Sequence, residues 1–281
     1  MIDFRADMHC HSLCSDGTFS PEKLVELAHQ IGLKGLSITD HDSIEAYPEA
    51  QITAERLGIC LLSGVEFSTE HLGVSIHVLA YGFALQHPLI AQFCARHLAR
   101  RIERNQEILA LLRKHRMPIK EEELSAISTR GTVGRPHIAL AMVKQGYVKT
   151  LREAFKKYLG EGKSCYAPGK AFSVEETLEV IHQAKGLAVI AHPHLIDNNR
   201  ILRSLLGMPF DGIECYYGRF PLQIHERWLD IAHKKQWLIS GGSDFHGEIK
   251  PDIALGCSWV NEELFDKFFQ YFQQQTQNFV P

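Results

Sequence analysis

The feature that most restricts the fold of this chain is a series of short apolar segments that each lead into a histidine or a carboxylate. The first segment runs from Ile2 to Met8 and is followed by His9 and His11. Because alternate side chains of a strand point to the same face, both imidazoles would leave such a strand on one side. Later apolar segments end in the same manner, at His41, Glu66, His192, Asp244 and His246, and His77 lies within a segment of its own.

Helical patterns separate most of these apolar segments. Ser20 and Pro21, for example, form a helix start, with the serine as the N-cap and the proline in the first turn. Strands that alternate with helices predict a parallel α/β architecture, and about seven such units favour a barrel over an open sheet. The carboxyl ends of parallel strands share one face of a barrel, so the residues that follow the segments would converge there.

One part of the chain departs from this alternation. Between about residues 86 and 164 the periodicity is helical and no strand pattern occurs, which predicts an all-helical insertion. We therefore expect a metal-binding barrel domain formed by residues 1–85 and 165–281, with residues 86–164 as a small substrate cap. The arginines between positions 96 and 104 would form the solvated face of a long helix in this insertion.

The composition limits the classes of partner. A net charge of −3 over 281 residues gives no overall positive field, so binding to long DNA is not expected. The seven cysteines are scattered without a C-x-x-C pair, which favours a reducing compartment. No run of roughly 18 apolar residues occurs, so we expect a cytoplasmic protein without membrane attachment.

A single pair of histidines at this spacing does not predict a metal site, since two histidines on a strand can also form a half-buried polar pair. The recurrence of histidines and carboxylates at one strand end after another is much harder to attribute to chance, and it predicts a centre with several metal ions. Mixed imidazole and carboxylate ligands suit Mn²⁺, Zn²⁺ or Fe²⁺. Such ions lower the pKa of bound water and clamp phosphoryl oxygens, which favours phosphate-ester hydrolysis.

Four motifs in chain order resemble those of the PHP (polymerase and histidinol phosphatase) family of phosphoesterases. They are His9 and His11 with Ser15-Asp16-Gly17, then Thr39-Asp40-His41, then Gly64-Val65-Glu66, and finally Ser243-Asp244-Phe245-His246. The resemblance covers the chain outside the predicted insertion and implies a distorted (β/α)7 barrel of PHP type. Within the family, the sequence most resembles the branch that acts on nucleoside 3′,5′-bisphosphates and on the 5′ ends of short RNA.

The resemblance also implies two or three divalent metal ions. The first would be held by His9, His11, Glu66 and Asp244; the second by Glu66, His77 and His192; and the third by Asp16, His41 and His246. The family often has histidine at the position of Asp16, so the third ion is the one that this sequence leaves open. Mn²⁺ is the expected metal because the resembled branch commonly uses it, with Zn²⁺ and Fe²⁺ as alternatives.

Two further predictions concern the reaction and the substrate. His194 would be the general acid if the strand that ends at His192 continues, whereas it would be a supporting or surface residue if Pro193 ends the strand. The segment from Thr132 to His137 opens a helix whose free N–H groups, together with Arg135 and His137, would bind a substrate phosphate. The alternative is an ordinary helix start with a solvated arginine.

The residues and the resemblance together predict a metal-dependent phosphoric ester hydrolase. The expected reaction removes the 3′-phosphate from nucleoside 3′,5′-bisphosphates (pAp to AMP), and the same site would act as a 5′-3′ exonuclease on short 5′-phosphorylated oligoribonucleotides. One alternative is a histidinol-phosphate phosphatase, which needs to hold only one phosphate. The other is a non-catalytic metal-binding scaffold module.

Overall fold

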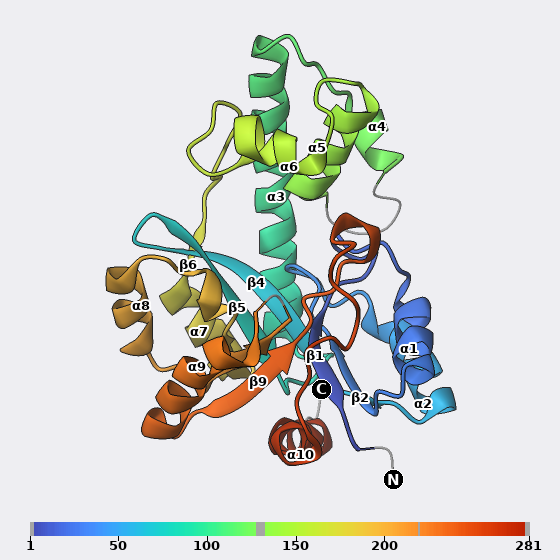
Figure 1. The fold of residues 1–281 in the computed structure, drawn as a ribbon, viewed down its shortest axis with the longest axis vertical. Coiled ribbons are helices and arrows are strands. Elements are labelled where there is room, and N and C mark those ends of the chain that lie inside the picture. Colours follow the sequence, from blue (N-terminus) through green and yellow to red (C-terminus); the bar gives the residue numbers. More distant parts are fainter. Residues whose placement is uncertain (1–2, 128–132, 219, 279–281) are drawn as a thin grey trace.

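The strands form two sheets in a computed structural model that describes residues 3–127, 133–218 and 220–278, and the α/β class is as predicted (Figure 1). One sheet is parallel, with the order β1-β2-β3 and the bounds Ala6–Cys10, Gly35–Ile38 and Cys60–Leu61. The other has the order β6-β4-β5-β7-β8-β9. Its strands are β4 Gly64–His71, β5 Val74–Tyr81, β6 Phe172–Ser173, β7 Leu187–Ile190, β8 Gly212–Tyr217 and β9 Leu238–Gly242.

The expected closed barrel of parallel strands is not confirmed. Strands β4 and β5 form an antiparallel hairpin, and β5 also runs antiparallel to β7. The hairpin turns at Leu72 and Gly73, whose φ angles of 52° and 80° are both positive, as a type I′ turn requires. No crossover helix is needed for such a turn, so counting apolar segments overestimates the parallel units. Across the described residues, the two sheets meet through isolated bridges, one of which joins His41 to Glu66.

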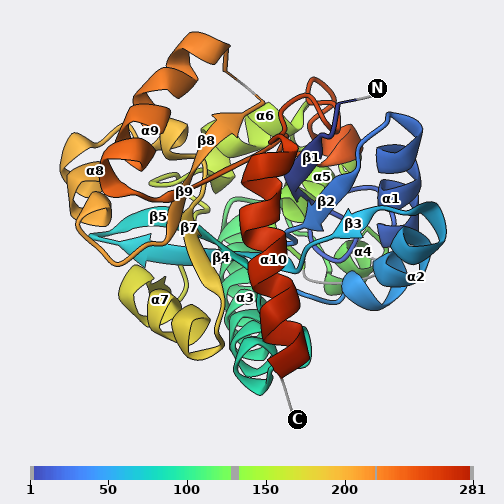
Figure 2. The same ribbon diagram turned by 90° about the horizontal axis from the view of Figure 1, so that it is seen from below.

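Helices cover the outer faces of both sheets (Figures 1 and 2). They are α1 Pro21–Gln30, α2 Tyr47–Leu57, α7 Val174–Gln183, α8 Asn199–Leu206, α9 Leu222–Lys235 and α10 Glu262–Asn278. Helix α1 begins as predicted, since the Ser20 side chain accepts a hydrogen bond from the backbone N–H of Lys23 and Pro21 lies in the first turn. Helix α10 lies across the underside, where Phe265 and Phe268 are fully buried.

The chain between β5 and β6 is helical where it is described. It contains α3 Pro88–Lys114, α4 Glu121–Ser125, α5 Arg135–Lys144, α6 Leu151–Ala154 and a π-helical turn at Phe155–Leu159. Helix α3 joins two cores, because Ile90 and Phe93 pack in the core of the large sheet while Ile108 and Leu112 pack against the other helices of this segment. The division into domains at residues 85 and 165 therefore stays a prediction, since one helix belongs to both cores.

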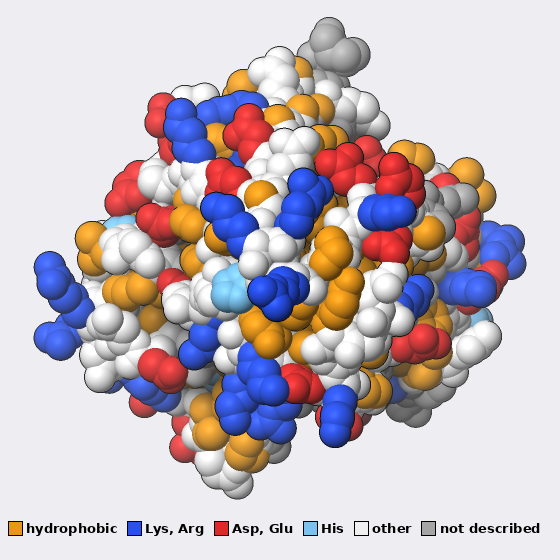
Figure 3. Space-filling model, turned by 90° about the horizontal axis from the view of Figure 1, so that it is seen from above, with side chains coloured by type: hydrophobic (Ala, Val, Ile, Leu, Met, Phe, Trp, Pro, Cys, Tyr) orange, Lys and Arg blue, Asp and Glu red, His pale blue; other side chains and the backbone are white. Residues whose placement is uncertain are grey.

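On the face seen from above in Figure 3, Lys and Arg side chains are interspersed with acidic and apolar ones. Among the described residues, no helix combines the length and the apolar character needed to cross a membrane.

Candidate metal centre and substrate cleft

Glu66 lies at the centre of the predicted ligand residues. Its Oε2 is 3.4 Å from His9 Nε2, 3.2 Å from His11 Nε2 and 3.1 Å from His41 Nδ1. Its Oε1 is 2.8 Å from His77 Nδ1 and 2.9 Å from His192 Nε2. One carboxylate therefore contacts five imidazoles that come from four different parts of the chain.

The position of Glu66 differs from the sequence prediction in one respect. The sequence predicts that Glu66 ends an apolar strand, but β3 ends at Leu61 and Glu66 is the third residue of β4. The side chain is buried, with 1% exposed. Burial alone would raise the pKa of Glu66, but the surrounding imidazoles, His77 foremost, hold it well below its usual range.

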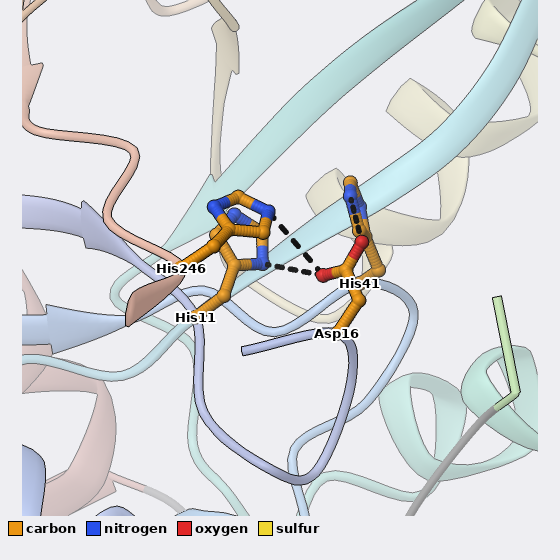
Figure 4. A group of neighbouring side chains, drawn as sticks. All are labelled: His11, Asp16, His41 and His246. Carbon is orange, nitrogen blue, oxygen red and sulfur yellow. Dashed lines mark ion pairs between the residues drawn. The ribbon is translucent and has the colours of Figure 1, made fainter. Parts of the chain in front are cut away.

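Asp16 lies at the centre of a second group of side chains, with His41 on one side and His11 and His246 on the other (Figure 4). Its carboxylate oxygens are 3.3 Å from His246 Nε2, 3.7 Å from His11 Nδ1 and 3.8 Å from His41 Nε2. Gly17 makes this loop possible, because a Cβ there would lie 2.2 Å from the backbone oxygen of His11. The loop thus brings Asp16 back over the end of β1.

Asp244 completes the set next to His9 and His11. Its Oδ1 is 3.6 Å from His9 Nε2 and 3.3 Å from His11 Nε2, and its Oδ2 accepts hydrogen bonds from Tyr217 Oη and Lys250 Nζ, each at 2.7 Å. The residue has a left-handed φ of 56°, which turns the chain sharply after β9. All nine residues that were predicted as ligands therefore lie together.

The arrangement fits divalent metal ions. Within the described residues, His9 Nε2, His11 Nε2, His41 Nδ1 and Glu66 Oε2 are buried and have no hydrogen-bond partner. Buried polar atoms are rarely left in this state unless an unseen group binds them. Two ligand atoms that each lie about 2.1 Å from one ion are roughly 3.0–3.4 Å apart, which matches the distances from Glu66 Oε2 to His9 Nε2 and His11 Nε2.

Glu214, in β8, is a residue of the centre that sequence reasoning missed. Its Oε1 accepts a hydrogen bond from His9 Nδ1 at 2.9 Å, and its Oε2 accepts one from the backbone N–H of His192 at 2.6 Å. With Nδ1 as the donor, His9 keeps the Nε2 lone pair free for a metal. The sequence shows only a lone carboxylate within Gly212–Tyr217, and its role becomes visible once the fold buries it completely beside His9.

A cleft of about 220 Å³ opens directly onto the centre. Its lining combines ligand-type residues with basic side chains: Asp16, His41, His77, His246, Lys250, Arg100, Arg101, Arg104 and Arg135. The prediction that the arginines of positions 96–104 face solvent is wrong for Arg101 and Arg104, which are each 6% exposed. It holds for Arg96, whose partly exposed side chain pairs with Glu176.

Arg104 is the most unusual of these cations. Its Nε and Nη2 are buried and have no hydrogen-bond partner among the described residues. Burial, reinforced by the nearby charges of Arg101 and Arg135, lowers the pKa of Arg104 to about 8. A buried guanidinium without a partner is costly, so the cleft is suited to a strongly anionic ligand.

The structure separates the two residues that were predicted to bind substrate phosphate. Arg135 begins α5 and lines the cleft, where its guanidinium lies over the ring of Tyr166 at 5.3 Å. His137 instead caps its own helix, because its Nδ1 accepts a hydrogen bond from the backbone N–H of Gly134 at 2.9 Å. Thr132, at the start of the predicted segment, lies outside the described residues.

His194 lies apart from the cleft lining. Strand β7 ends at Ile190, and Pro193–Leu195 form a 3₁₀ turn, so the strand does not continue to His194. Its ring packs against those of Tyr217 and Phe220, with centroids 5.6 and 5.4 Å away, and burial lowers the pKa of His194 to about 3. The alternative in which Pro193 ends the strand fits this arrangement, and the role of general acid stays a prediction from the sequence.

The chain is similar to known proteins over most of its length. The PHP domain model matches residues 7–186. The 5′-3′ exoribonuclease Rnm of Escherichia coli is 36% identical, over 89% of this chain and 87% of its own length. The 3′,5′-nucleoside bisphosphate phosphatase of Chromobacterium violaceum is 31% identical, over 88% of this chain and 90% of its own length. The structure of an amidohydrolase from Chromobacterium violaceum, with bound sulfate and no metal, superimposes with a TM-score of 0.85 at 28% identity, covering 95% of this chain and 96% of that one. Together with the histidine and carboxylate centre, these matches show that the chain belongs to the PHP domain family.

Proposed function

We propose that this protein is a metal-dependent phosphohydrolase that removes the 3′-phosphate from nucleoside 3′,5′-bisphosphates such as pAp. We extend the proposal to the removal of nucleotides from the 5′ end of short 5′-phosphorylated oligoribonucleotides. The observation that carries the proposal is the cleft itself, which is lined both by buried arginines and by residues of the histidine and carboxylate centre. The activities for which the two bacterial relatives are named, those of an exoribonuclease and a bisphosphate phosphatase, support it.

The centre would hold two or three divalent ions, and Mn²⁺ is our proposed metal. His9, His11, Glu66 and Asp244 would hold one ion, Glu66 with His77 and His192 a second, and Asp16 with His41 and His246 a third. Bound ions would supply an activated water and stabilise the charge on the reacting phosphoryl group. Glu214 would keep His9 in the tautomer that offers Nε2 to the metal.

The arginines would bind the second phosphate, which does not react. Arg104 lines the cleft and has two buried donors without a partner among the described residues, and Arg135 is held in place over Tyr166. Binding one phosphate at a fixed distance from the centre would orient the other for attack and lower the entropic part of the barrier. Histidinol phosphate has only one phosphate, so a histidinol-phosphate phosphatase would leave the buried arginine charge without a ligand.

The test uses a panel of substrates and measures the release of inorganic phosphate from pAp, 3′-AMP, 5′-AMP and histidinol phosphate, and the release of nucleoside 5′-monophosphate from a short 5′-phosphorylated RNA. We expect pAp to exceed 3′-AMP in kcat/KM by on the order of a hundredfold, because a charged group that meets buried partners contributes several kcal/mol. Comparable values for pAp and 3′-AMP would contradict a bisphosphate substrate. Preferential turnover of histidinol phosphate would support the histidinol-phosphate phosphatase instead.

A further inference from the structure

Asp42 connects the metal centre to the helical segment above it. It follows His41 in the chain, and its side chain is buried. Its Oδ2 accepts a hydrogen bond from Arg101 Nε at 2.6 Å and forms a second contact with Arg101 Nη2. Its Oδ1 accepts a hydrogen bond from the backbone N–H of Ser68 at 2.7 Å and lies 3.1 Å from His97 Nδ1.

The backbone of Asp42 is tied to the same centre. Its N–H donates to the backbone oxygen of Glu66 at 3.0 Å, beside the bridge that joins His41 to Glu66. Its φ of 57° lies in the left-handed region, which residues other than glycine, asparagine and aspartate rarely adopt. One residue thus fixes a loop that carries His41, the strand that carries Glu66, and helix α3.

Arg101 differs from the other arginines of the cleft because its charge already has a buried partner. Besides Asp42, it donates to Ser68 Oγ at 2.8 Å. Arg100 and Arg104 lie beside it on α3 and line the same cleft. The pair of Asp42 and Arg101 therefore sets the position of these two arginines relative to His41.

We infer that Asp42 is a positioning residue which, through Arg101, fixes the distance between the metal centre and the cations that bind the second phosphate, and so determines selectivity for bisphosphorylated substrates. This inference rests on the proposed function. A substrate that is held at both phosphates needs this distance to be correct, whereas a substrate held only by its reacting phosphate does not.

The test compares kcat and KM for pAp and for 3′-AMP in the Mn²⁺-loaded full chain. Asp42→Asn is the main variant, because asparagine tolerates the left-handed φ and still accepts from Ser68 while losing the ion pair with Arg101. We expect kcat/KM for pAp to fall by on the order of ten- to a hundredfold, with 3′-AMP changed by less than about twofold. Asp211→Asn is the control: Asp211 accepts hydrogen bonds from His182 and from the backbone N–H of Ala188, outside the cleft lining, and both substrates should be unaffected.

Arg101→Met and the double variant complete a cycle. If the two residues act through each other, the double variant should lose no more selectivity than either single variant. Arg101→Lys keeps the positive charge but loses the two-pronged guanidinium contact with Asp42, so it should retain an intermediate selectivity. This variant replaces Asp42→Asn in the test if Asp42→Asn does not fold. An unchanged ratio of pAp to 3′-AMP, or an equal loss for both substrates with loss of bound Mn²⁺, would overturn the inference alone. A wild-type chain that does not prefer pAp would overturn the proposed function and the inference with it.

Discussion

At the scale of single residues, Glu214 is not one of the proposed metal ligands but holds two of them, His9 and His192, in position. Its carboxylate orients His9 through Nδ1 and holds the backbone of His192. We expect Glu214→Gln to weaken Mn²⁺ binding by roughly 10- to 100-fold, because the amide is a poorer acceptor for the imidazole N–H. Titration of metal-free protein with Mn²⁺ measures this affinity, and saturating Mn²⁺ should recover most of the activity. Glu179→Gln, on the exposed face of α7, should bind Mn²⁺ as the wild type does; equal weakening in both variants would contradict the role of Glu214.

Removing the charge of Arg104 should have opposite effects on stability and on substrate preference. Because its buried guanidinium has no described partner, Arg104→Met should stabilise the protein in a buffer free of phosphate and sulfate. The same variant should lose the preference for pAp over 3′-AMP. Thermal unfolding with and without inorganic phosphate measures the first effect, and phosphate should strongly stabilise the wild type but not Arg104→Met. Arg96→Met is the control, since Arg96 pairs with Glu176 at the surface. Destabilisation of Arg104→Met without phosphate would show that the charge has a partner.

The residues that could be predicted from the sequence are those that follow strand ends. His11, His41, His192 and Asp244 could be placed together because the ends of strands leave a pattern in the sequence. Glu214 and Arg104 could not, since each depends on which element packs against it. A helix face that carries several arginines predicts a solvated face. Here β4 and the residues near Gly169 cover that face, so closely that a Cβ on Gly169 would lie 3.1 Å from Arg104 Cβ.

At the scale of elements, the β4–β5 hairpin is the main departure from the predicted alternation. Its turn places Leu72 at a φ of 52° although the side chain is 60% exposed, so nothing in the core requires a leucine there. We expect Leu72→Asn to raise the free energy of unfolding by about 1 kcal/mol, because asparagine adopts this region at lower cost and Asn-Gly favours the type I′ turn. Chemical denaturation measures the change.

Ile52→Asn is the matched control for the hairpin variant. It also removes an exposed apolar side chain, 71% exposed, but from the middle of α2, where asparagine brings no conformational gain. Stabilisation of both variants by the same amount would assign the effect to lost surface hydrophobicity and not to the turn. The missing Asn-Gly signal is also the reason that the hairpin could not be predicted: Leu-Gly resembles an ordinary break between two strands.

At the scale of the whole molecule, the centre lies where the two sheets meet. His9 belongs to the three-stranded sheet, whereas Glu66 and His77 belong to the six-stranded one, and the contacts between the sheets include single bridges such as Cys10 with Phe245. The sequence could predict a common face for the ligands but not this seam, because pairing between distant strands leaves no local pattern. Ions bound at the centre would therefore link the sheets as well as support the reaction.

Metal loading should for this reason stabilise the whole fold. A ligand present at about a hundred times its Kd stabilises by about 2.7 kcal/mol for each site, so Mn²⁺ should raise the melting temperature and chelation should lower it. Asp244→Ala should lose part of this gain together with the activity, because it removes a carboxylate near His9 and His11. Asp211→Asn should retain both. Elemental analysis after Mn²⁺ loading should find two or three ions in the wild type. If Mn²⁺ raised the melting temperature of wild type and Asp244→Ala equally, the metal would bind elsewhere. If the protein bound metal but turned over no substrate of the panel, a non-catalytic scaffold would be favoured over an enzyme.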